Sequence, residues 1–331
     1  MRDVAARADV SVQTVSNIVN ARFHLMGDET RTRVERAMSE LGYHPNIAAR
    51  TLRLARSQTV CFLLLDEDNQ FLADPMTALV IAGLGDVARE RGYGLLIRAA
   101  LPDQPDPSVL KSLLENRADG ALLFLSGEPE LRRWYVSNLA ELGFPFILLE
   151  TWNQPGVMTV TAADRDGARE LTDHLIRAGH ERIAFVTTAV PWPMLEQRLL
   201  GYRDALEAAR LEPAVFTGGT WTPASGEALV SVILDGRQPP TAIMCGNDLL
   251  ALGAIRSVRQ RGLRIPEDVA VTGFNNFDFA EFTDPPLTTV RVPGYDIGRA
   301  AGEALVDVLE GESPRRSHMV LPVELKLRAS G

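Results

Sequence analysis

The sequence is poor in the features that mark an exported, membrane-spanning or disulfide-stabilised protein. Its 331 residues include only two cysteines and 6% aromatic side chains. It has no run of roughly eighteen apolar residues and no secretory signal at its start, so we expect a soluble, cytoplasmic protein without a membrane-spanning helix. Cys61 and Cys245 lie in apolar, strand-like runs and need not pair, which fits a reducing compartment.

Motifs of metal and nucleophile chemistry are missing as well. The sequence has neither a G-x-S-x-G nucleophile elbow nor a Walker phosphate loop. Its histidines lack the spacing of metal ligands and stand at positions His24, His44, His174, His180 and His318. Asp66-Glu67-Asp68 could hold a cation, although a solvated loop after a strand is the simpler interpretation. We therefore expect no enzyme activity, no metal and no cofactor.

One glycine pattern has the form of a dinucleotide-binding loop. The stretch from Gly83 to Ala88 spells G-x-G-x-x-A. However, the apolar residues around it keep helical spacing through both glycines, and Pro75 stands where a helix can begin. The pattern therefore indicates a helix over residues 75–92 and not a nicotinamide site.

Positive charge is concentrated near the N-terminus. Residues 1–58 hold nine arginines against six acidic residues, a net charge of +3, whereas the whole chain carries −9 and the remainder therefore −12. A basic head on an acidic body is typical of a DNA-reading module attached to a solvated control module.

The N-terminal stretch predicts two short helices that pack on each other within residues 3–20. Asp9 tolerates a left-handed backbone at the break between them, and Ser11 is a good N-cap for the second helix. The apolar residues that we expect at their contact are Val4, Ala5, Ala8, Val10, Val15, Ile18 and Val19.

The outer face of the second helix carries short polar side chains. Hydroxyl and amide groups of this kind suit phosphates and base edges. The residues expected on or beside this face are Ser11, Val12, Gln13, Thr14, Ser16, Asn17 and Asn20. The pair of helices therefore predicts a DNA-binding helix-turn-helix with its recognition helix at about residues 12–20. An ordinary helical hairpin is the alternative.

A third helix is expected within residues 29–46. It has an apolar stripe of Val34, Ala37, Met38 and Leu41, and Gly42 provides a C-terminal stop. The order DVA, VS, TVS and VN, then ETR and LGYHPN, then A-x-R-x-L, resembles the lactose-repressor (LacI/GalR) family of bacterial transcription regulators. The resemblance continues at matching places through the whole chain.

This resemblance implies a helix-turn-helix domain at 1–45, a hinge helix at 46–57 and an effector-binding and dimerisation domain at 58–331. A helix as short as the hinge is marginal by itself in water. By analogy it would order on operator DNA and wedge Leu52 into the minor groove beside Arg53. A plain linker is the alternative. Further DNA contacts implied at matching positions are Thr30, Tyr43 and Asn46.

From residue 58 onward, apolar strand candidates alternate with helix-length stretches, which predicts an α/β fold of doubly wound parallel sheets covered on both faces. The strand candidates are 59–65, 95–99, 120–125, 146–150, 158–162, 183–188, 241–246 and 269–274. The helix-length stretches are 105–117, 129–142, 164–178, 195–210, 223–235 and 247–261.

The resemblance implies two lobes of the type I periplasmic-binding-protein fold. The N-lobe would comprise about 58–160 and 290–319, and the C-lobe about 161–289 and 320–331. Three chain crossings would join them, near 158–163, 285–293 and 318–322.

Ligands of such sheets bind at the carboxyl ends of the strands, here in the cleft between the lobes. At matching positions the resemblance implies an effector site made of Glu150, Arg198, Trp221, Asn247 and Asn275. An arginine, amides, a carboxylate and an indole suit a polyhydroxylated small molecule. We therefore expect a sugar or sugar derivative, with purines and nucleosides as the alternative.

The chain departs from the family pattern at several positions. Asn275 stands where the family usually has Asp, which removes a negative charge and favours an effector carrying a carboxylate or phosphate. Asp9 replaces the usual Gly, Asn17 replaces the usual Arg, and one additional residue follows Asn20. The first few residues expected ahead of Asp3 are missing. The operator sequence is therefore not predictable by analogy.

These observations predict an effector-controlled, DNA-binding transcription regulator, in this family most often a repressor, that acts as a homodimer or a tetramer. One recognition helix reads only a few base pairs, so two-fold pairing over a palindrome multiplies discrimination. A solute-binding protein of a transport system shares the two-lobed fold, but it lacks residues 1–57 and needs an export signal. An enzyme on a doubly wound sheet is the third alternative.

Overall fold

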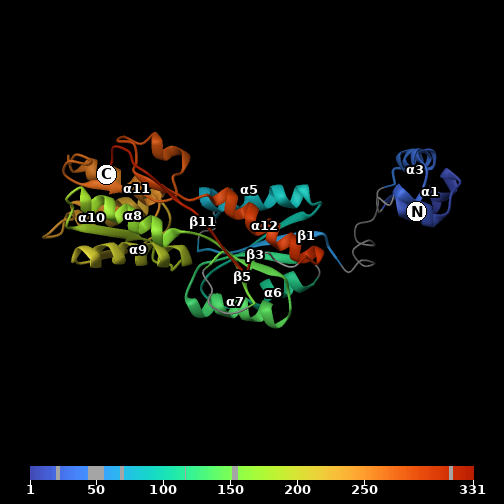
Figure 1. Cartoon of the computed structure of the whole chain (residues 1–331), viewed down its shortest axis with the longest axis horizontal. Helices are drawn as coiled ribbons and strands as arrows, with labels where there is room; N and C mark the ends of the chain where they lie inside the picture. The colour runs from blue at the N-terminus through green and yellow to red at the C-terminus, as the bar shows by residue number, and fades with distance from the viewer. Residues whose placement is uncertain (20–22, 44–55, 68–70, 116, 151–155, 313–315) are drawn as a thin grey trace. The chain divides into compact units, whose positions relative to one another are not determined.

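The computed structural model describes residues 1–331 except 20–22, 44–55, 68–70, 116, 151–155 and 313–315 (Figure 1). The described chain forms two compact units, a head of Met1–Arg56 and a body of Ser57–Gly331. The head is helical and the body is α/β, so the predicted fold class is confirmed. Within the described residues, no helix is both long and apolar enough to cross a membrane.

The head consists of α1 (Arg2–Ala8), α2 (Val12–Val19), the short 3-10 helix η1 (Phe23–Leu25) and α3 (Asp28–Glu40). Its buried core is made of Val4, Ala5, Ala8, Val15, Ile18, Val34 and Ala37. The predicted contact between the first two helices is therefore confirmed. The prediction that Leu41 belongs to the apolar stripe is wrong. Helix α3 ends at Glu40, and Leu41 is 48% exposed because the chain turns at Gly42, which has a φ of 56°.

The N-lobe of the body contains a six-stranded parallel sheet in the order β11-β5-β4-β3-β1-β2. These strands are β1 (Thr59–Leu65), β2 (Gly94–Ala100), β3 (Gly120–Leu125), β4 (Phe146–Leu148), β5 (Met158–Ala162) and β11 (His318–Leu321). The 3-10 helix η2 (Phe71–Ala73) precedes α5 (Pro75–Glu90), which covers one face with α12 (Gly294–Glu310), while α6 (Pro107–Leu114) and α7 (Pro129–Glu141) cover the other (Figure 1).

Alternation along β1 shows why both faces need a cover. Phe62 and Leu64 join the apolar cluster that contains α5 and α12, whereas Leu63 and Leu65 join the cluster of α6 and α7. Successive strand residues point to opposite faces of a sheet, so a strand that is apolar at every position must be buried on both sides.

The C-lobe contains a four-stranded parallel sheet in the order β7-β6-β8-β9. These strands are β6 (Ile183–Thr187), β7 (Ala214–Thr217), β8 (Ala242–Cys245) and β9 (Ala270–Thr272). Its helices are α8 (Asp164–Arg177), α9 (Pro193–Ala209), α10 (Pro223–Leu234), α11 (Asp248–Gln260) and the 3-10 helix η3 (Asp278–Glu281). Strands β10 (Thr289–Arg291) and β12 (Glu324–Lys326) form a separate antiparallel pair.

The chain passes between the lobes after β5, after β10 and after β11. Two strands near the cleft are shorter than the sequence pattern predicts. Strand β9 ends at Thr272 and not at residue 274, because the chain turns towards Asn275 and Asn276, whose φ values are positive. Strand β4 ends at Leu148, two residues before Glu150.

The helices of each lobe are paired through glycines that lie against backbone. A Cβ added to Gly83 in α5 would lie 2.1 Å from the carbonyl oxygen of Tyr295 in α12. The same addition to Gly201 or Gly253 would meet a backbone oxygen of the neighbouring helix at 2.1 Å or 1.9 Å. The G-x-G-x-x-A pattern therefore lies within helix α5, as predicted, and its first glycine serves helix packing.

Candidate functional site

The helix-turn-helix break is built as the sequence predicts. Asp9 caps α1 in a left-handed conformation, with φ and ψ both 54°. The Ser11 hydroxyl accepts a hydrogen bond from the backbone N–H of Thr14 at 3.0 Å, which satisfies one of the free donors at the start of α2.

The outward face of α2 is polar and held in place by its own side chains. Gln13 is exposed, and its amide nitrogen donates to the Asn17 side-chain oxygen at 3.1 Å. The hydroxyls of Ser11 and Thr14 lie 2.9 Å apart, and Val12 is 44% exposed beside them. This arrangement presents donors and acceptors of the kind that bind base edges and phosphates.

Ser16 does not belong to this exposed face. The residue is only 5% exposed, so the prediction that it lies on the outer face is wrong. It lies in α2 between two residues of the head core, the buried Val15 and Ile18. A role for its hydroxyl in contacting DNA stays a prediction.

The other predicted DNA contacts lie elsewhere in the head. Thr30 is half-buried in the first turn of α3, and Tyr43 packs on the head core. Four of them fall outside the described residues: Asn20, Asn46, Leu52 and Arg53. The hinge helix predicted at 46–57 also lies mostly outside them.

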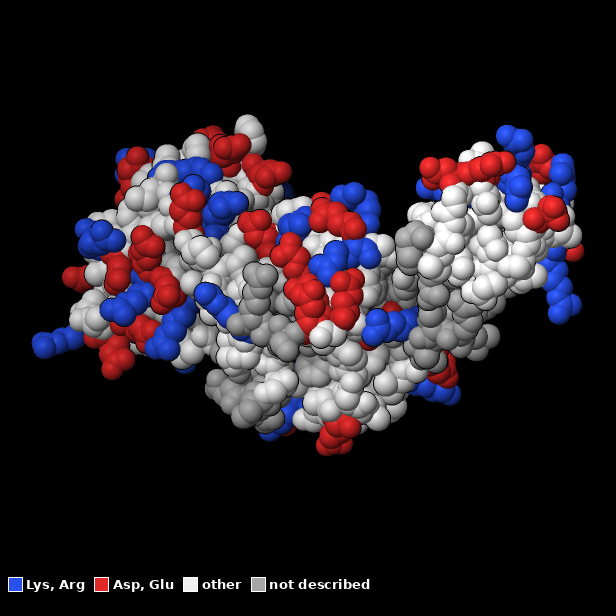
Figure 2. Space-filling view, turned by 45° about the vertical axis from the view of Figure 1, so that its right-hand side comes forward, with Lys and Arg blue, Asp and Glu red and all other residues white. Residues whose placement is uncertain are grey.

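The charges of the head occur partly as ion pairs. Arg7 lies 2.6 Å from Glu40, and Arg31 lies 2.6 Å from Glu35. The Arg31 guanidinium also stacks on the ring of Phe23 at 4.0 Å, a contact that the sequence pattern did not predict. In the view of Figure 2, arginine and acidic side chains are interspersed on the head, so its net positive charge does not form one unbroken basic surface there.

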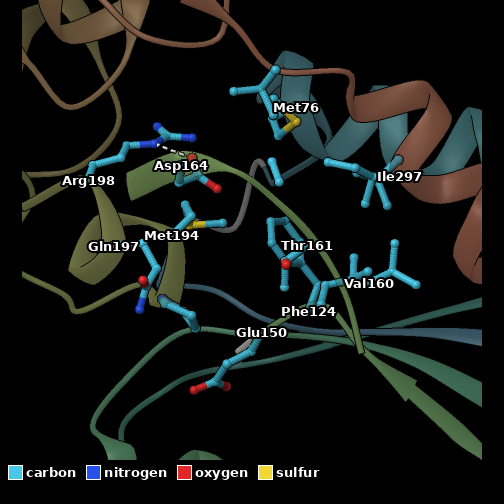
Figure 3. Close-up of a pocket in the computed structure, with 15 residues that line it drawn as sticks. Met76, Phe124, Glu150, Val160, Thr161, Asp164, Met194, Gln197, Arg198 and Ile297 are labelled. Carbon is cyan, nitrogen blue, oxygen red and sulfur yellow. Dashed lines mark hydrogen bonds and ion pairs between the residues drawn. The ribbon is translucent and has the colours of Figure 1, made fainter. Parts of the chain in front are cut away.

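Three adjoining cavities lie along the cleft of the body. The inner cavity is mostly apolar, with Glu150, Asp164, Gln197 and Arg198 among its polar walls (Figure 3). The middle cavity is lined by Asp74, Met76, Phe124, Trp192, Met194, Arg198, Trp221, Asn247 and Asn275. The outer cavity adjoins it at Asp74 and Trp221 and adds Asp66, Glu67 and Phe71. Four of the five predicted effector residues therefore meet at the middle cavity, while Glu150 lies at the inner one.

Three hydrogen-bond acceptors and an aromatic ring of the protein hold the Arg198 guanidinium in place. It is 3% exposed, and its Nε donates to Asp164 at 2.7 Å, as Figure 3 marks. One terminal nitrogen donates to the carbonyl oxygen of Gly246 at 2.7 Å and the other to the Asn275 side-chain oxygen at 3.0 Å. The guanidinium also lies 4.0 Å from the centre of the Phe274 ring. Since a guanidinium has five N–H donors, two remain for other acceptors.

The other three predicted effector residues at the middle cavity also have defined places in the fold. The Asn247 side-chain oxygen caps α11 by accepting from the N–H of Leu250 at 2.9 Å, so its amide nitrogen is the group left for a ligand. Asn275 has a φ of 109°, a conformation in which asparagine is favoured over most other residues. Trp221 is half-buried between the middle and outer cavities.

Glu150 forms an ion pair with a residue that the sequence pattern did not indicate. Its carboxylate accepts a hydrogen bond from Arg132, which is itself almost fully buried. In Figure 3 this carboxylate lies well apart from Arg198. Burial raises the pKa of Glu150 to about 7, against the lowering effect of Arg132 and with a further raising effect of Glu196.

Two further carboxylates escaped prediction. Asp164 starts α8, and burial raises the pKa of its carboxyl despite the pairing with Arg198. Asp248 follows Asn247, and burial raises its pKa to about 7. It accepts from the backbone N–H of Phe277 at 2.7 Å and from the Thr289 hydroxyl at 2.6 Å. The available signal was an acidic residue at the first position of the helix that follows a strand, because such residues lie at the ligand edge of a parallel sheet.

The remaining sequence features have structural explanations. His180 contacts the Thr241 hydroxyl at 3.1 Å, and burial lowers its pKa. Cys61 and Cys245 are buried and unpaired. Asp66 and Glu67 border the outer cavity, and Asp68 lies outside the described residues. Within the described ranges no group of three His, Cys, Asp or Glu side chains could hold a metal ion.

Comparison with known proteins matches both units. Residues 1–46 match the family of bacterial regulatory proteins, lacI family, and residues 172–331 match the periplasmic binding protein-like domain. The whole chain is 32% identical to the HTH-type transcriptional repressor CytR of Escherichia coli K12, covering 95% of that protein. It is 35% identical over 99% of its length to the HTH-type transcriptional regulator CelR of Thermobifida fusca, covering 97% of that protein.

Solved structures agree over the same length. The lac repressor dimer bound to operator and the anti-inducer ONPF superimposes with a TM-score of 0.86 at 26% identity, covering 99% of this chain and 97% of that one. A complex of the regulator CelR with cellobiose gives a TM-score of 0.73 at 32% identity, covering 99% and 98%. The chain therefore belongs to the lacI family of bacterial regulatory proteins and is a DNA-binding transcriptional regulator.

Proposed function

We propose that the protein binds operator DNA as a homodimer and that a neutral, polyhydroxylated molecule in the body cleft switches this binding. The observation that carries the proposal is the convergence of Arg198, Asn247 and Asn275 on one cavity beside the indole of Trp221. Directional donors and acceptors next to an aromatic face are the usual means of holding a sugar ring.

The DNA contacts follow from the exposed face of α2. Gln13 and Asn17 would read base edges with Val12 against a thymine methyl group, while Ser11 and Thr14 would hold phosphates. The proposed set also includes Ser16, Asn20, Thr30, Tyr43, Asn46, Leu52 and Arg53, on the strength of the sequence resemblance.

A homodimer is supported by the geometry of DNA reading. One recognition helix reads only a few base pairs, and two-fold pairing would place two such helices on a palindromic operator. The lac repressor, which superimposes on this chain with a TM-score of 0.86, was solved as a dimer bound to operator.

The charge of the cleft supports a neutral effector. The carboxylates of Asp66, Glu67 and Asp74 border the middle and outer cavities, and Asp164 already neutralises Arg198. An anion would meet repulsion there. This argument outweighs the expectation, drawn from Asn275 alone, that the effector carries a carboxylate or phosphate. CelR has been solved with cellobiose, and we propose a neutral sugar for this chain too.

A nucleoside is the second candidate, because the Trp221 ring could stack on a base and the Asn247 amide nitrogen could donate to its edge. In either case the ligand would alter the angle between the lobes and so the spacing of the two heads. Binding of DNA and of effector must then be coupled reciprocally, typically by ~1–3 kcal/mol.

Fluorescence anisotropy with DNA from the gene's own upstream region tests the proposal. Neutral sugars, sugar acids, sugar phosphates and nucleosides are titrated into the complex. We expect one neutral class to change DNA affinity at least about fivefold. Activity confined to the acids or phosphates would contradict the proposed ligand chemistry, and no binding to DNA under any condition would contradict the regulator mechanism.

A further inference from the structure

A buried arginine joins the two lobes at the inner end of the cleft. Arg132 lies in α7 of the N-lobe and is 1% exposed. One of its terminal nitrogens donates to Glu150, which belongs to the same lobe. The other donates to Glu196 at 2.5 Å, and Glu196 lies in the first turn of α9 in the C-lobe. The guanidinium therefore holds one carboxylate from each lobe.

Two other contacts between the lobes lie in the same segments. The ring of Phe124, at the end of β3, packs 5.0 Å from the ring of Trp192, which precedes α9. The backbone N–H of Gly127 donates to the carbonyl oxygen of Pro191 at 2.8 Å. Apolar, backbone and ionic contacts thus join the two lobes at these segments.

The ionic contact is incompletely satisfied. Among the described residues, the Nε of Arg132 and the second carboxylate oxygen of Glu150 are buried without a hydrogen-bond partner. A buried ion pays a large desolvation cost, so each bond that remains to it matters more than it would at the surface. Separation of the lobes would take Glu196 away from Arg132, because the two residues belong to different lobes.

We propose that Arg132, Glu150 and Glu196 form a lobe latch, in which Arg132 is the positioning residue that sets how far the cleft closes before any effector arrives. The latch concerns the regulation of the proposed effector cleft and rests on that proposed function for its biological role. Its existence as a contact between the lobes does not depend on the identity of the ligand or of the operator.

The latch is sensitive to pH. The charged groups that act on Glu150 are Arg132 from α7 and Glu196 from α9, while Asp164 and Arg198 pair with each other in the wall of the same cavity. When the lobes separate, water reaches Glu150 and the negative Glu196 moves away. Both changes lower the Glu150 pKa from its value of about 7, so closure takes up a proton. The closed form is therefore favoured at low pH, and this contribution is lost as pH rises from the lower pKa of the open form to about 7.

Hydrogen exchange at the Gly127 amide tests the latch in the full-length protein without effector or DNA. Arg132→Met should lower the protection factor of this amide about tenfold or more, since one change removes both ionic contacts. Arg132→Lys should restore only part of it, because an ammonium lacks the fork that reaches two carboxylates. Arg133→Met, which alters the exposed neighbour on the same helix, is the matched control and should change nothing.

Wild-type protection at Gly127, corrected for intrinsic exchange, should fall as pH rises from about 5 to about 7 and level off above that, and Glu150→Gln should flatten this profile. If Arg132→Met fails to fold, Glu196→Gln supplies the same test from a half-exposed side chain. Unchanged protection in a folded Arg132 or Glu196 variant, or an identical pH profile in Glu150→Gln, would overturn the latch. Neither result would affect the proposed DNA or sugar binding.

Discussion

The face of α2 and the middle cavity use similar side chains in opposite ways. On α2, Gln13 and Asn17 are bonded to each other at a surface open to solvent. In the cleft, Arg198 and Asn247 are buried, and each is bonded to groups that the fold itself needs. The first arrangement can exchange its partner for DNA at little cost, whereas the second is a fixed template. Substitutions on the exposed face of α2 should therefore reduce DNA binding without reducing stability. Substitutions of the buried cleft residues should reduce both effector binding and stability.

The largest expected effect is at the centre of the template. Arg198→Ala leaves Asp164 buried without its cation and should lower the free energy of unfolding by ~3–5 kcal/mol, as well as abolish the effector response. Denaturant unfolding and calorimetry measure the two effects. Arg203→Ala removes an exposed arginine from the same helix and is the control. If Arg198→Ala lost ligand binding at unchanged stability, the proposed difference between the buried cleft residues and the exposed face of α2 would be wrong.

A pH effect should follow from Asp248 in the body. Its pKa of about 7 lies above the ordinary value of 3.8, so the folded state holds the proton more tightly than the unfolded one. The contribution of Asp248 to stability therefore falls as pH rises from about 4 to about 7. Asp248→Asn should reduce this slope in urea unfolding series.

The matched control for this effect is an aspartate whose pKa is shifted in the opposite direction. The pKa of Asp268 is lowered to about 2 by its hydrogen bonds with Arg264, and it stays ionised over this range. Asp268→Asn should therefore leave the slope unchanged. An equal slope in wild type and Asp248→Asn would show that burial does not perturb this carboxyl.

On the head, Gln13→Ala should cost on the order of 1–3 kcal/mol of operator affinity and relax specificity. Its side chain is exposed and bonds to Asn17 on the same face, so stability should change by less than about 0.5 kcal/mol. Mobility-shift titration and thermal unfolding of one preparation give both numbers, with exposed Ser39→Ala as the control. Full affinity for the native operator would remove Gln13 from the reading face.

The smallest effect is expected where the head departs from its family. Asp9 holds a φ of 54°, a region that glycine enters without strain. Asp9→Gly should raise head stability by about 0.5–1 kcal/mol at most, with DNA affinity unchanged. Exchange of the Val10 amide, which donates to the Ala5 carbonyl oxygen, reports it. Arg210→Gly makes the same change at the end of α9 in the body.

Patterns that follow one helix or one strand were predictable from the sequence. The helix spacing of Val4, Ala8, Val15 and Ile18 gave the core of the head, and unbroken apolar runs gave the parallel strands. Leu41 was misplaced because α3 ends one residue before it, and Ser16 because it lies between the buried Val15 and Ile18 at the border of the apolar stripe of α2.

Contacts between distant segments were not predictable in this way. The motif resemblance indicated Arg198 and Asn275, but nothing local to the sequence indicates that Asp164 neutralises the arginine. Arg132 and Glu196 are separated by 64 residues and reveal their pairing only in the folded body. Ionic partners depend on how the lobes pack and not on periodicity.

The glycines that hold the paired helices of each lobe leave no room for one helix to slide on another. At Gly83 and Gly253 the neighbouring backbone already occupies the space of a methyl group. Each lobe should therefore move as a solid piece, and any rearrangement must be taken up by the three connections between the lobes. A small change of angle at those connections would therefore produce a larger displacement at the end of the N-lobe that lies farthest from them.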